Sequence, residues 1–596
     1  MNLLEQDLSR PLAHPYATSN LTLLWASTLV ETCARLGLEH VVLCPGSRVS
    51  PLTVAFTQHP QFKCYSVLDE RSAAFFALGI AKALGKPAAV VCTSGTAAAN
   101  FYPAVIEAHY SRVPLLILTA DRPPELQHCA AEQTMLQEGL YGRFPRYQMS
   151  LAAPEPQLEF FKWMRQSMIH AYQQTMSARP GPVHVNIPLR DPMAPIGGPI
   201  PADLMEALKN PNFFAHIERP ARWEKTLSAE AVSDRLTLWK SVERGLIISG
   251  PYTGTDPEGH IAATIALAHE LGWPVLASPM SPLRFQTDLC HNLIAGYDAI
   301  LRNPELCERL CPHAVIQLGR WPTSKFLRSW LSNCGARVFS LDESEENLDS
   351  QHTESVPLAV GPQAFKAACT SEVPAHNAYM HEWRKLEKQV QASIDDSLDQ
   401  ASPHFEGAIS RIVAESLPEG TPLFISTSTP IRDAEFFMPA SDRHLMPFVN
   451  RGVNGLDGMI STALGIAEGV GRPMVQVIGD LGLLHDSNGL LIKPEFNGSL
   501  TLVLINNEGG GIFEHLPIAR FNPPAERFII TEQSVNFAQL VESLGIAYEK
   551  IEELEALRSR LQYLPAKGIR VIEVCTQRKA DAKTRTSILN LASEQL

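Results

Sequence analysis

The chain has 596 residues, of which 45% are hydrophobic and 19% are charged, and its formal net charge is −13 at pH 7. A chain of this length exceeds what one hydrophobic core supports, so about two to four domains are expected. The acidic balance, without any basic block, makes nucleic acid and anionic membrane surfaces poor candidates as partners. No apolar segment reaches 18 residues, the N-terminus lacks a signal-peptide pattern, and the eleven cysteines form no CxxC motif, so we expect a cytoplasmic protein with reduced thiols.

The first part of the chain alternates strand-like and helix-like segments. The apolar runs are HVVLC, KCYSVL, AAVVCT and PLLILTA, and each leads into a segment with helical patterning or a Pro-rich turn. Such alternation indicates βαβ units, in which a parallel sheet carries helices on both faces. After VHVNIP, the Pro- and Gly-rich stretch RDPMAPIGGPIPADL is typical of a linker. We therefore predict an N-terminal α/β domain at residues 1–195.

Two further α/β domains are predicted, at residues 196–400 and 401–596. The central one contains GLIISG, PVLA, AVIQLG and ARVFSL, and it ends in a charged stretch expected to be a solvated amphipathic helix and connector. The C-terminal one contains PLFIST, MVQVIGD, LTLVLINN and IRVIEV. The segment GLIISGPYTG could suggest a dinucleotide fold, but it lacks a complete GxGxxG. We expect three doubly wound parallel-sheet domains, with no flavin in the central one.

Two strands of the third domain end in oxygen-bearing residues. MVQVI leads into Gly479-Asp480, and LTLVLI leads into Asn506-Asn507. Open α/β sheets bind ligands at the carboxyl ends of their strands. A carboxylate, an amide and a backbone carbonyl suit Mg²⁺, which completes its octahedron with phosphate and water. Turn-forming residues at two ordinary strand ends would give the same letters. The spacing, however, resembles that of thiamine diphosphate (ThDP) enzymes, where Asp480, Asn507 and the Gly509 carbonyl would bind Mg²⁺ or Mn²⁺.

One carboxylate of the first domain fits the same cofactor. ThDP enzymes place a carboxylate beside the pyrimidine ring nitrogen, where it stabilises the imino tautomer that accepts the C2 proton. Glu70 follows KCYSVL and opens a helix. The helix macrodipole alone would favour a carboxylate there, so its presence beside the metal motif in one chain is what favours catalysis. In ThDP enzymes the glutamate and the metal motif come from different subunits, which implies a homodimer, alone or paired into a homotetramer.

Five basic residues follow apolar strands or Gly/Pro turns rather than helix faces with acidic partners. They are Arg48, Arg122, Lys325, Arg432 and Arg451. Any one of them could be ordinary solvated surface. Five in equivalent places in an acidic chain predict a site for polyanionic substrates, because arginine binds carboxylates with two parallel hydrogen bonds.

Several motifs together resemble one branch of the ThDP enzymes. They are PGSRVSPLT, LDERSAAFFALG, TSGTAAANFYPAVIEA, LTADRPPEL, NRGVNGLDG and GDLGLLHDSNGL. The chain is similar, over nearly its whole length, to the 2-succinyl-5-enolpyruvyl-6-hydroxy-3-cyclohexene-1-carboxylate (SEPHCHC) synthase family of menaquinone and phylloquinone biosynthesis. That family, of the transferase class, decarboxylates 2-oxoglutarate and adds the succinyl carbanion to isochorismate in a 1,4-addition. Both substrates are dicarboxylates, which agrees with the five cations.

The resemblance also implies roles for individual residues. The catalytic residues would be Glu70, Gln133 and Arg48. Leu456 would be the bulky wedge under the bent cofactor, and the cofactor site would comprise Glu70, Ser428, Leu456, Asp480, Asn507, Ile512 and Phe513. The substrate site would comprise Ser47, Arg48, Arg122, Gln133, Lys325, Ser428, Arg432 and Arg451.

Two positions depart from the family pattern. Glu132 stands where many members have asparagine before Gln133, which puts the contacts near Gln133 in doubt. Phe326 stands where some members have a second basic residue, which would leave Lys325 alone at that corner. Neither departure touches the cofactor motifs.

Two alternatives remain open at this point. A different ThDP enzyme, such as another 2-oxoacid decarboxylase or an acetohydroxyacid-synthase-like carboligase, would present fewer arginines to its substrates. A catalytically inactive scaffold would have no need of an intact Glu70, Asp480 and Asn507.

Overall fold

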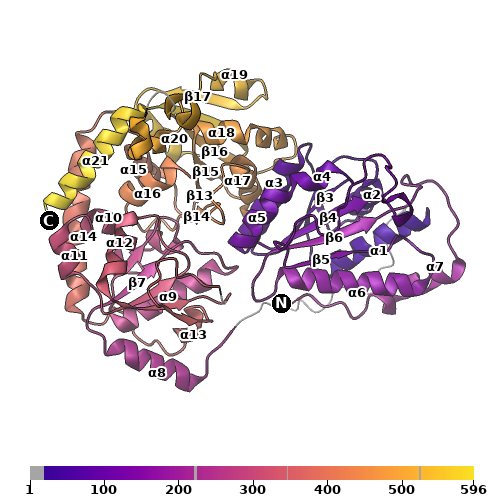
Figure 1. The fold of residues 1–596 in the computed structure, drawn as a ribbon, viewed down its shortest axis with the longest axis horizontal. Helices are drawn as coiled ribbons and strands as arrows, with labels where there is room; N and C mark the ends of the chain where they lie inside the picture. Colours follow the sequence, from indigo (N-terminus) through magenta and orange to yellow (C-terminus); the bar gives the residue numbers. More distant parts are fainter. Residues whose placement is uncertain (1–18, 221–224, 345, 522–524) are drawn as a thin grey trace. The chain divides into compact units, whose positions relative to one another are not determined.

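The computed structural model describes residues 19–220, 225–344, 346–521 and 525–596, and in this part of the chain it contains three parallel six-stranded sheets (Figure 1). The chain divides into two compact units. The first unit combines residues 1–223 with 457–470 and 486–496, and the second combines residues 224–456 with 471–485 and 497–596. The predicted fold class, three doubly wound parallel sheets with interleaved helices, is confirmed.

The first sheet lies in the first unit and has the strand order β2-β1-β3-β4-β6-β5. Every residue of β3, β4 and β6 is buried, because helices pack on both faces of a doubly wound sheet. This burial is why these strands are nearly continuous apolar runs. The strands are β1 (His40–Leu43), β2 (Lys63–Ser66), β3 (Ala88–Cys92), β4 (Leu115–Asp121), β5 (Tyr147–Ser150) and β6 (Pro182–Pro188). The helices are α1 (Leu21–Arg35), α2 (Ser50–Gln58), α3 (Glu70–Leu84), α4 (Thr96–Asn100), α5 (Tyr102–Ser111), α6 (Leu158–Thr175) and α7 (Ala202–Lys209).

Helix α3, which begins at Glu70, packs closely along α17 (Met459–Val470) in the same unit. The two helices cross where Gly79 faces Gly465. A Cβ atom built on Gly79 would lie 2.2 Å from the carbonyl oxygen of Thr462, so no larger residue fits at this crossing. The close approach fixes the position of α3 and therefore of the glutamate at its start.

The second sheet lies in the second unit and has the order β12-β11-β10-β7-β8-β9. Its strands are β7 (Gly245–Ser249), β8 (Val275–Ala277), β9 (Leu293–Ile294), β10 (Ala314–Leu318), β11 (Arg337–Leu341) and β12 (Val356–Leu358). The helices are α8 (Ala229–Lys240), α9 (Pro257–Leu271), α10 (Tyr297–Ile300), α11 (Pro304–Arg309), α12 (Lys325–Cys334), α13 (Gln363–Lys366) and α14 (Ala378–Asp399).

Helix α14 is the charged stretch that the sequence predicts to be a solvated connector. It is amphipathic as expected, but one face is buried in the core of the second unit. Trp383, Leu386, Val390 and Ile394 recur at helical spacing along that face. Residue 195 lies in a segment without helix or strand, and residue 400 follows α14 directly. The two boundaries between the three domains stay predictions.

The third sheet also lies in the second unit and has the order β14-β13-β15-β16-β18-β17. Its strands are β13 (Pro422–Ile425), β14 (Met446–Phe448), β15 (Met474–Gly479), β16 (Ser499–Asn506), β17 (Ala547–Ile551) and β18 (Gly568–Cys575). The helices are α15 (Glu406–Ser416), α16 (Thr429–Phe437), α18 (Asp480–His485), α19 (Phe537–Glu542), α20 (Leu554–Gln562) and α21 (Arg578–Glu594). None of the described helices has the length and hydropathy needed to cross a membrane.

Buried polar contacts join the second and third sheets within the second unit. Arg284 is 1% exposed, and its guanidinium donates to the carbonyl oxygen of Ala277 at 2.6 Å and to that of Met438. The Tyr297 hydroxyl donates to Glu435 in the same region. Because buried polar groups without partners are costly, these contacts fix the second sheet against α16.

Candidate active site

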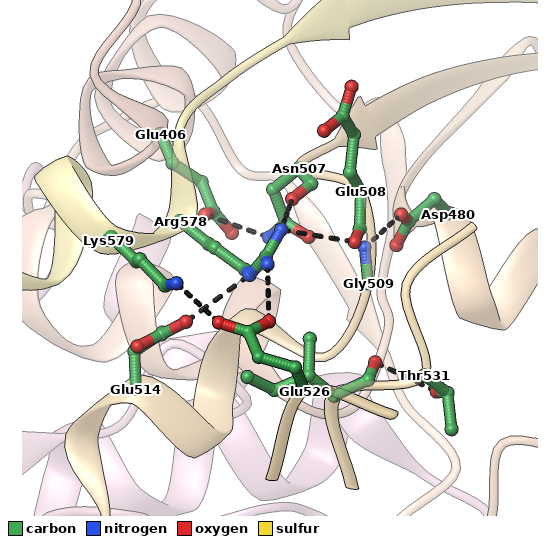
Figure 2. Close-up of polar contacts among 11 residues, drawn as sticks. Glu406, Asp480, Asn507, Glu508, Gly509, Glu514, Glu526, Thr531, Arg578 and Lys579 are labelled. Atoms are coloured by element: carbon green, nitrogen blue, oxygen red, sulfur yellow. Dashed lines mark hydrogen bonds and ion pairs between the residues drawn. The ribbon is translucent and has the colours of Figure 1, made fainter. Parts of the chain in front are cut away.

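The carboxyl ends of β15 and β16 bring the predicted metal ligands to one edge of the third sheet. The parallel register pairs Gly479 with Ile505, so Asp480 and Asn507 both follow directly at that edge (Figure 2). Asp480 is 2% exposed, and its carboxylate accepts hydrogen bonds from the backbone N–H of Gly509 at 2.6 Å and of Leu481 at 2.8 Å. Burial raises the pKa of the Asp480 carboxyl to about 6, against the lowering effect of these N–H groups.

The Asn507 amide has one satisfied and one unsatisfied end. Its Nδ2 donates to Oε2 of Glu406 at 3.2 Å, whereas its buried Oδ1 has no hydrogen-bond partner among the described residues. A hard cation needs oxygen ligands such as this unpaired amide oxygen and the buried Asp480 carboxylate at the same edge of the sheet. The described residues contain no group of three or more His, Cys, Asp or Glu that could hold a metal. A site built from one carboxylate, one amide and one carbonyl satisfies both observations, so these residues fit Mg²⁺.

The loop that carries the third predicted ligand has an unusual backbone. Gly509 has a φ of 131°, and a Cβ atom built on it would lie 2.8 Å from the carbonyl oxygen of Ile530, so glycine is required. Arg578, the first residue of α21, donates to the carbonyl oxygens of Asn507 at 3.4 Å and Glu508 at 3.2 Å. Arg578 therefore fixes the loop, and no motif in the sequence indicates this role.

Apart from Glu70, the remaining predicted cofactor residues belong to the same unit. Ile512 and Phe513 are half-buried in a 3₁₀ turn, Gly511–His515, that follows the Gly509 loop. Ser428, before α16, has a φ of 74°, which is strained for a residue with a side chain, and its carbonyl oxygen accepts a hydrogen bond from Arg432 at 2.6 Å. Leu456 is half-buried and follows the Arg451 segment.

The second unit also gathers a group of cations. The pKa of Arg432 is lowered to about 10, mainly by burial and then by the neighbouring Arg451 and Arg328. The pKa of His515 is lowered to about 4 by partial burial and by four nearby cations. Those four are Arg585, Arg432, Arg302 and Lys325. Of the five basic residues predicted from sequence, Lys325, Arg432 and Arg451 thus lie in one electropositive region.

Arg302 and Arg328 are cations that sequence reasoning missed. The guanidinium carbon of Arg302 lies 4.2 Å from the centre of the Phe326 ring and 5.7 Å from that of Phe436, so it sits between α12 and α16. Lys325 therefore has a second cation near it, although Phe326 replaces the basic residue found in some family members. Arg328 lies one helical turn after Lys325, and this spacing is a signal that the sequence did contain.

Another arginine holds the segment that carries Arg451. Arg320, in the loop after β10, donates to the carbonyl oxygens of Arg451 at 3.4 Å and Gly452 at 3.1 Å. The central sheet thus supports the NRG segment directly.

Glu70 lies at the switch point of the first sheet, where the strand order reverses around β1. The N-cap of α3 is Asp69, whose carboxylate accepts hydrogen bonds from the backbone N–H of Ser72 at 3.1 Å and from the Asn488 amide at 2.7 Å. The pKa of the Cys44 thiol, at the end of β1, is raised by burial and further by the charges of Glu70 and Asp69. Glu70 is half-buried beside this strand end.

The other predicted residues of the first unit meet at the same edge of the sheet. Arg48 is 8% exposed and donates to the carbonyl oxygen of Leu189 at 2.9 Å, and its pKa is lowered by burial and by Arg122. Arg122 donates to the carbonyl oxygen of Glu132 at 3.2 Å. Gln133, with a φ of 53°, donates to the carbonyl oxygen of Ser94 at 2.9 Å. The exposed Ser47 precedes Arg48.

Comparison with known proteins agrees with this arrangement. The family model described as thiamine pyrophosphate enzyme, N-terminal TPP binding domain, matches residues 25–142. The model described as middle domain of thiamine pyrophosphate matches residues 217–425, and that for the C-terminal TPP binding domain matches residues 434–574. Thiamine pyrophosphate is another name for ThDP, so the predicted cofactor is confirmed.

Curated relatives cover nearly the whole chain. The SEPHCHC synthase of Trichormus variabilis is 45% identical over 592 residues, which is 98% of this chain and 100% of the relative. That of Rippkaea orientalis is 44% identical over 566 residues, or 94% and 95%. This chain belongs to the SEPHCHC synthase family. The fold has a wider distribution: the crystal structure of benzoylformate decarboxylase from Polynucleobacter necessarius matches with a TM-score of 0.68 at 16% identity, covering 93% of this chain and 98% of that one.

Proposed function

We propose that the protein converts 2-oxoglutarate and isochorismate into SEPHCHC and CO₂ with ThDP, in menaquinone or phylloquinone biosynthesis. Relatives named for this product share 43% to 45% of their residues with the chain. The observation that carries the proposal is the electropositive region of the second unit. Lys325, Arg432 and Arg451 lie there with three further arginines, in the same unit as the proposed metal ligands.

The diphosphate end of the site would be built by the third sheet. Asp480, Asn507 and the carbonyl oxygen of Gly509 would hold Mg²⁺ or Mn²⁺, leaving the remaining positions of the octahedron to phosphate oxygens and water. Ile512 and Phe513 would wall the pocket, and Leu456 would support the bend of the cofactor. Bound ThDP supplies a carbon nucleophile and an electron sink, which is the chemistry that decarboxylation of a 2-oxo acid requires.

The pyrimidine end of the site would be built by the first unit. The Glu70 carboxyl would hold a proton against the ring nitrogen of the aminopyrimidine and so select its reactive tautomer. Its place at the start of α3, fixed through the Gly79 crossing, suits a group that must not move. Because the family places this glutamate and the metal motif on different subunits, we propose a homodimer, alone or paired into a homotetramer.

The cations would bind and orient the two dicarboxylates. Lys325, Arg432 and Arg451 would act with Ser428 from the second unit. Ser47, Arg48, Arg122 and Gln133 would act from the first unit of the partner subunit. Charge-assisted hydrogen bonds from arginine to a carboxylate are directional, so these side chains would hold each substrate in one orientation. Arg48 and Gln133 would stand nearest the reacting atoms.

We also propose a cytoplasmic location. All eleven cysteines are free thiols, which is expected in a reducing compartment.

The test is product detection by mass spectrometry. Purified protein with ThDP and Mg²⁺ should form SEPHCHC from 2-oxoglutarate and isochorismate, and pyruvate should replace 2-oxoglutarate poorly because it lacks the distal carboxylate. A protein that uses pyruvate in preference to 2-oxoglutarate would instead be an acetohydroxyacid-synthase-like carboligase.

A further inference from the structure

A buried glutamate contacts the proposed metal ligand Asn507. Glu406, the first residue of α15, is 2% exposed. Its Oε2 accepts the hydrogen bond from Nδ2 of Asn507 at 3.2 Å, and its Oε1 has no hydrogen-bond partner in the described part of the chain (Figure 2). The two residues are 101 positions apart in sequence, so the contact is a product of the tertiary fold.

The chemistry of this contact selects one orientation of the amide. The two ends of an asparagine side chain have nearly the same shape, but one end donates and the other accepts. The Oε2 of Glu406 is an acceptor, so the Nδ2 end of Asn507 is held toward Glu406. The Oδ1 end, which is the only end with lone pairs for a cation, is then held away from it and lies buried and unpaired among the described residues.

An ion pair with Arg585 does not by itself explain why a glutamate is buried at position 406. Arg585 is 3% exposed, and two of its nitrogens donate to the Asp433 carboxylate, Nε at 2.5 Å and Nη2 at 2.7 Å. Its Nη2 is 3.8 Å from Oε2 of Glu406, which is beyond hydrogen-bond range. Arg585 therefore already has a bidentate partner. Among the described residues, the side-chain hydrogen bond of Glu406 is the one to Asn507, and burying a carboxyl group without any hydrogen-bond partner would be costly.

We propose that Glu406 is a positioning residue that holds the Asn507 amide with its oxygen toward the metal; the inference rests on the proposed metal site. Mutating a group that orients a metal ligand in this way commonly lowers metal affinity about 10- to 100-fold. Mg²⁺ demands near-ideal octahedral geometry, whereas Ca²⁺ tolerates distortion. Loosening the orientation of Asn507 should therefore weaken ThDP binding in the presence of Mg²⁺ more than ThDP binding in the presence of Ca²⁺.

The experiment is a ThDP titration by calorimetry on the full-length protein, at increasing Mg²⁺ and separately at increasing Ca²⁺. Glu406→Leu, which keeps the volume but removes the acceptor, should raise the Mg²⁺ concentration needed for half-maximal ThDP binding about 10- to 100-fold. The increase with Ca²⁺ should be smaller. Glu406→Gln retains one acceptor oxygen and should give a smaller shift than leucine.

A comparable pair at the preceding residue provides the control. Asn506 precedes Asn507, and its Nδ2 donates to Glu573, which is 5% exposed, at 2.7 Å. Glu573→Leu and Glu573→Gln break a similar but partly buried asparagine–glutamate contact at a residue that is not a proposed ligand. They should lower the unfolding temperature of the metal-free protein but leave the Mg²⁺ requirement within about twofold, well below the change of about 10-fold or more expected for a partner of a ligand.

Each outcome decides the proposal. If folded Glu406→Leu has the wild-type Mg²⁺ requirement, or if its Mg²⁺ and Ca²⁺ shifts are equal, Glu406 does not position the ligand. If the leucine variant does not fold, equal shifts in Glu406→Gln and Glu573→Gln would overturn the proposal. Asp480→Ala separates the proposed metal site from the positioning role of Glu406. Unaltered metal dependence of ThDP binding in Asp480→Ala refutes the metal site itself. If Asp480→Ala loses metal-dependent ThDP binding but Glu406→Leu does not, only the positioning role is refuted.

Discussion

Replacing Arg302 with methionine tests the part of the cation group that no motif predicted. Methionine retains an apolar stem but removes the charge. In the second unit, the Arg302 guanidinium lies over the Phe326 ring, and its Nε donates to Oδ1 of Asp298 at 3.0 Å. The other carboxylate oxygen of Asp298 accepts from Ser324, the N-cap of α12, at 2.5 Å. That bond remains after the substitution, so the start of α12 should be preserved.

Two quantities should change, and they can be measured separately. Losing a hydrogen bond to a charged group costs about 1.5–3 kcal/mol, and losing the cation–π contact costs about 0.5–2 kcal/mol. The free energy of unfolding should therefore fall by about 2–5 kcal/mol. If Arg302 also contacts a substrate carboxylate, the Michaelis constant for that dicarboxylate should rise about 10- to 150-fold.

Steady-state kinetics with 2-oxoglutarate and isochorismate varied in turn will show which substrate is affected. ThDP affinity by calorimetry should be unchanged, because Arg302 contacts none of the proposed cofactor residues in the described part of the chain. Arg309→Met is the control: Arg309 ends the neighbouring helix α11, its side chain is 56% exposed, and it pairs with Glu382. A less stable Arg302→Met protein with both Michaelis constants within twofold of the wild type would show that Arg302 has only a structural role.

Three further predictions test other parts of the molecule. Asp480→Ala should abolish metal-dependent ThDP affinity in calorimetry while circular dichroism shows an intact fold, because it removes the one carboxylate of the proposed metal set; wild-type affinity would exclude that role. Glu70→Gln should still bind ThDP but lose about 10²- to 10⁴-fold in activity, and NMR should show slower exchange of the C2 hydrogen of bound ThDP; an exchange rate equal to wild type would leave Glu70 as a helix-start residue only. His184 is 1% exposed, contacts the Thr119 hydroxyl at 2.8 Å, and has its pKa lowered to about 3 by burial. Below pH 6.5, His184 therefore binds a proton in the unfolded chain but stays neutral in the native protein. The contribution of this group should lower the free energy of unfolding by about 1.4 kcal/mol per pH unit as the pH drops below 6.5. Chemical denaturation of His184→Gln, compared with wild type between pH 7 and 4.5, should show a flatter dependence, and parallel curves would contradict the assignment.

The predictable part of the site consists of strand ends. Strands buried on both faces must be apolar throughout, so MVQVI and LTLVLI are visible in the sequence, and so are the residues that stop them. Parallel register then brings Asp480 and Asn507 to one edge without any further information. The same reasoning applies to Glu70, which begins α3 after the short turn that follows β2.

The amphipathic character of α14 was predictable for a related reason, but its burial was not. Polar and charged residues together make up most of its sequence, which suggests a solvated helix. Trp383 is nevertheless fully buried and packs edge-to-face with Trp330 at a centroid distance of 6.1 Å. Whether an apolar stripe is covered depends on which element packs against it, and periodicity alone carries no information about that.

The sequence by itself therefore determined the three doubly wound sheets and the residues at the ends of strands, because local periodicity and chain order are sufficient to place them. It indicated the cofactor class only through the resemblance of its motifs to those of ThDP enzymes. Only the tertiary structure decided the partners of those residues. Glu406 reaches Asn507, Arg578 holds the Gly509 loop, and Arg302 lies over Phe326, each from an element distant in the chain. Such pairings arise from the packing of helices against the sheets, and the spacing of residues in the sequence does not determine that packing.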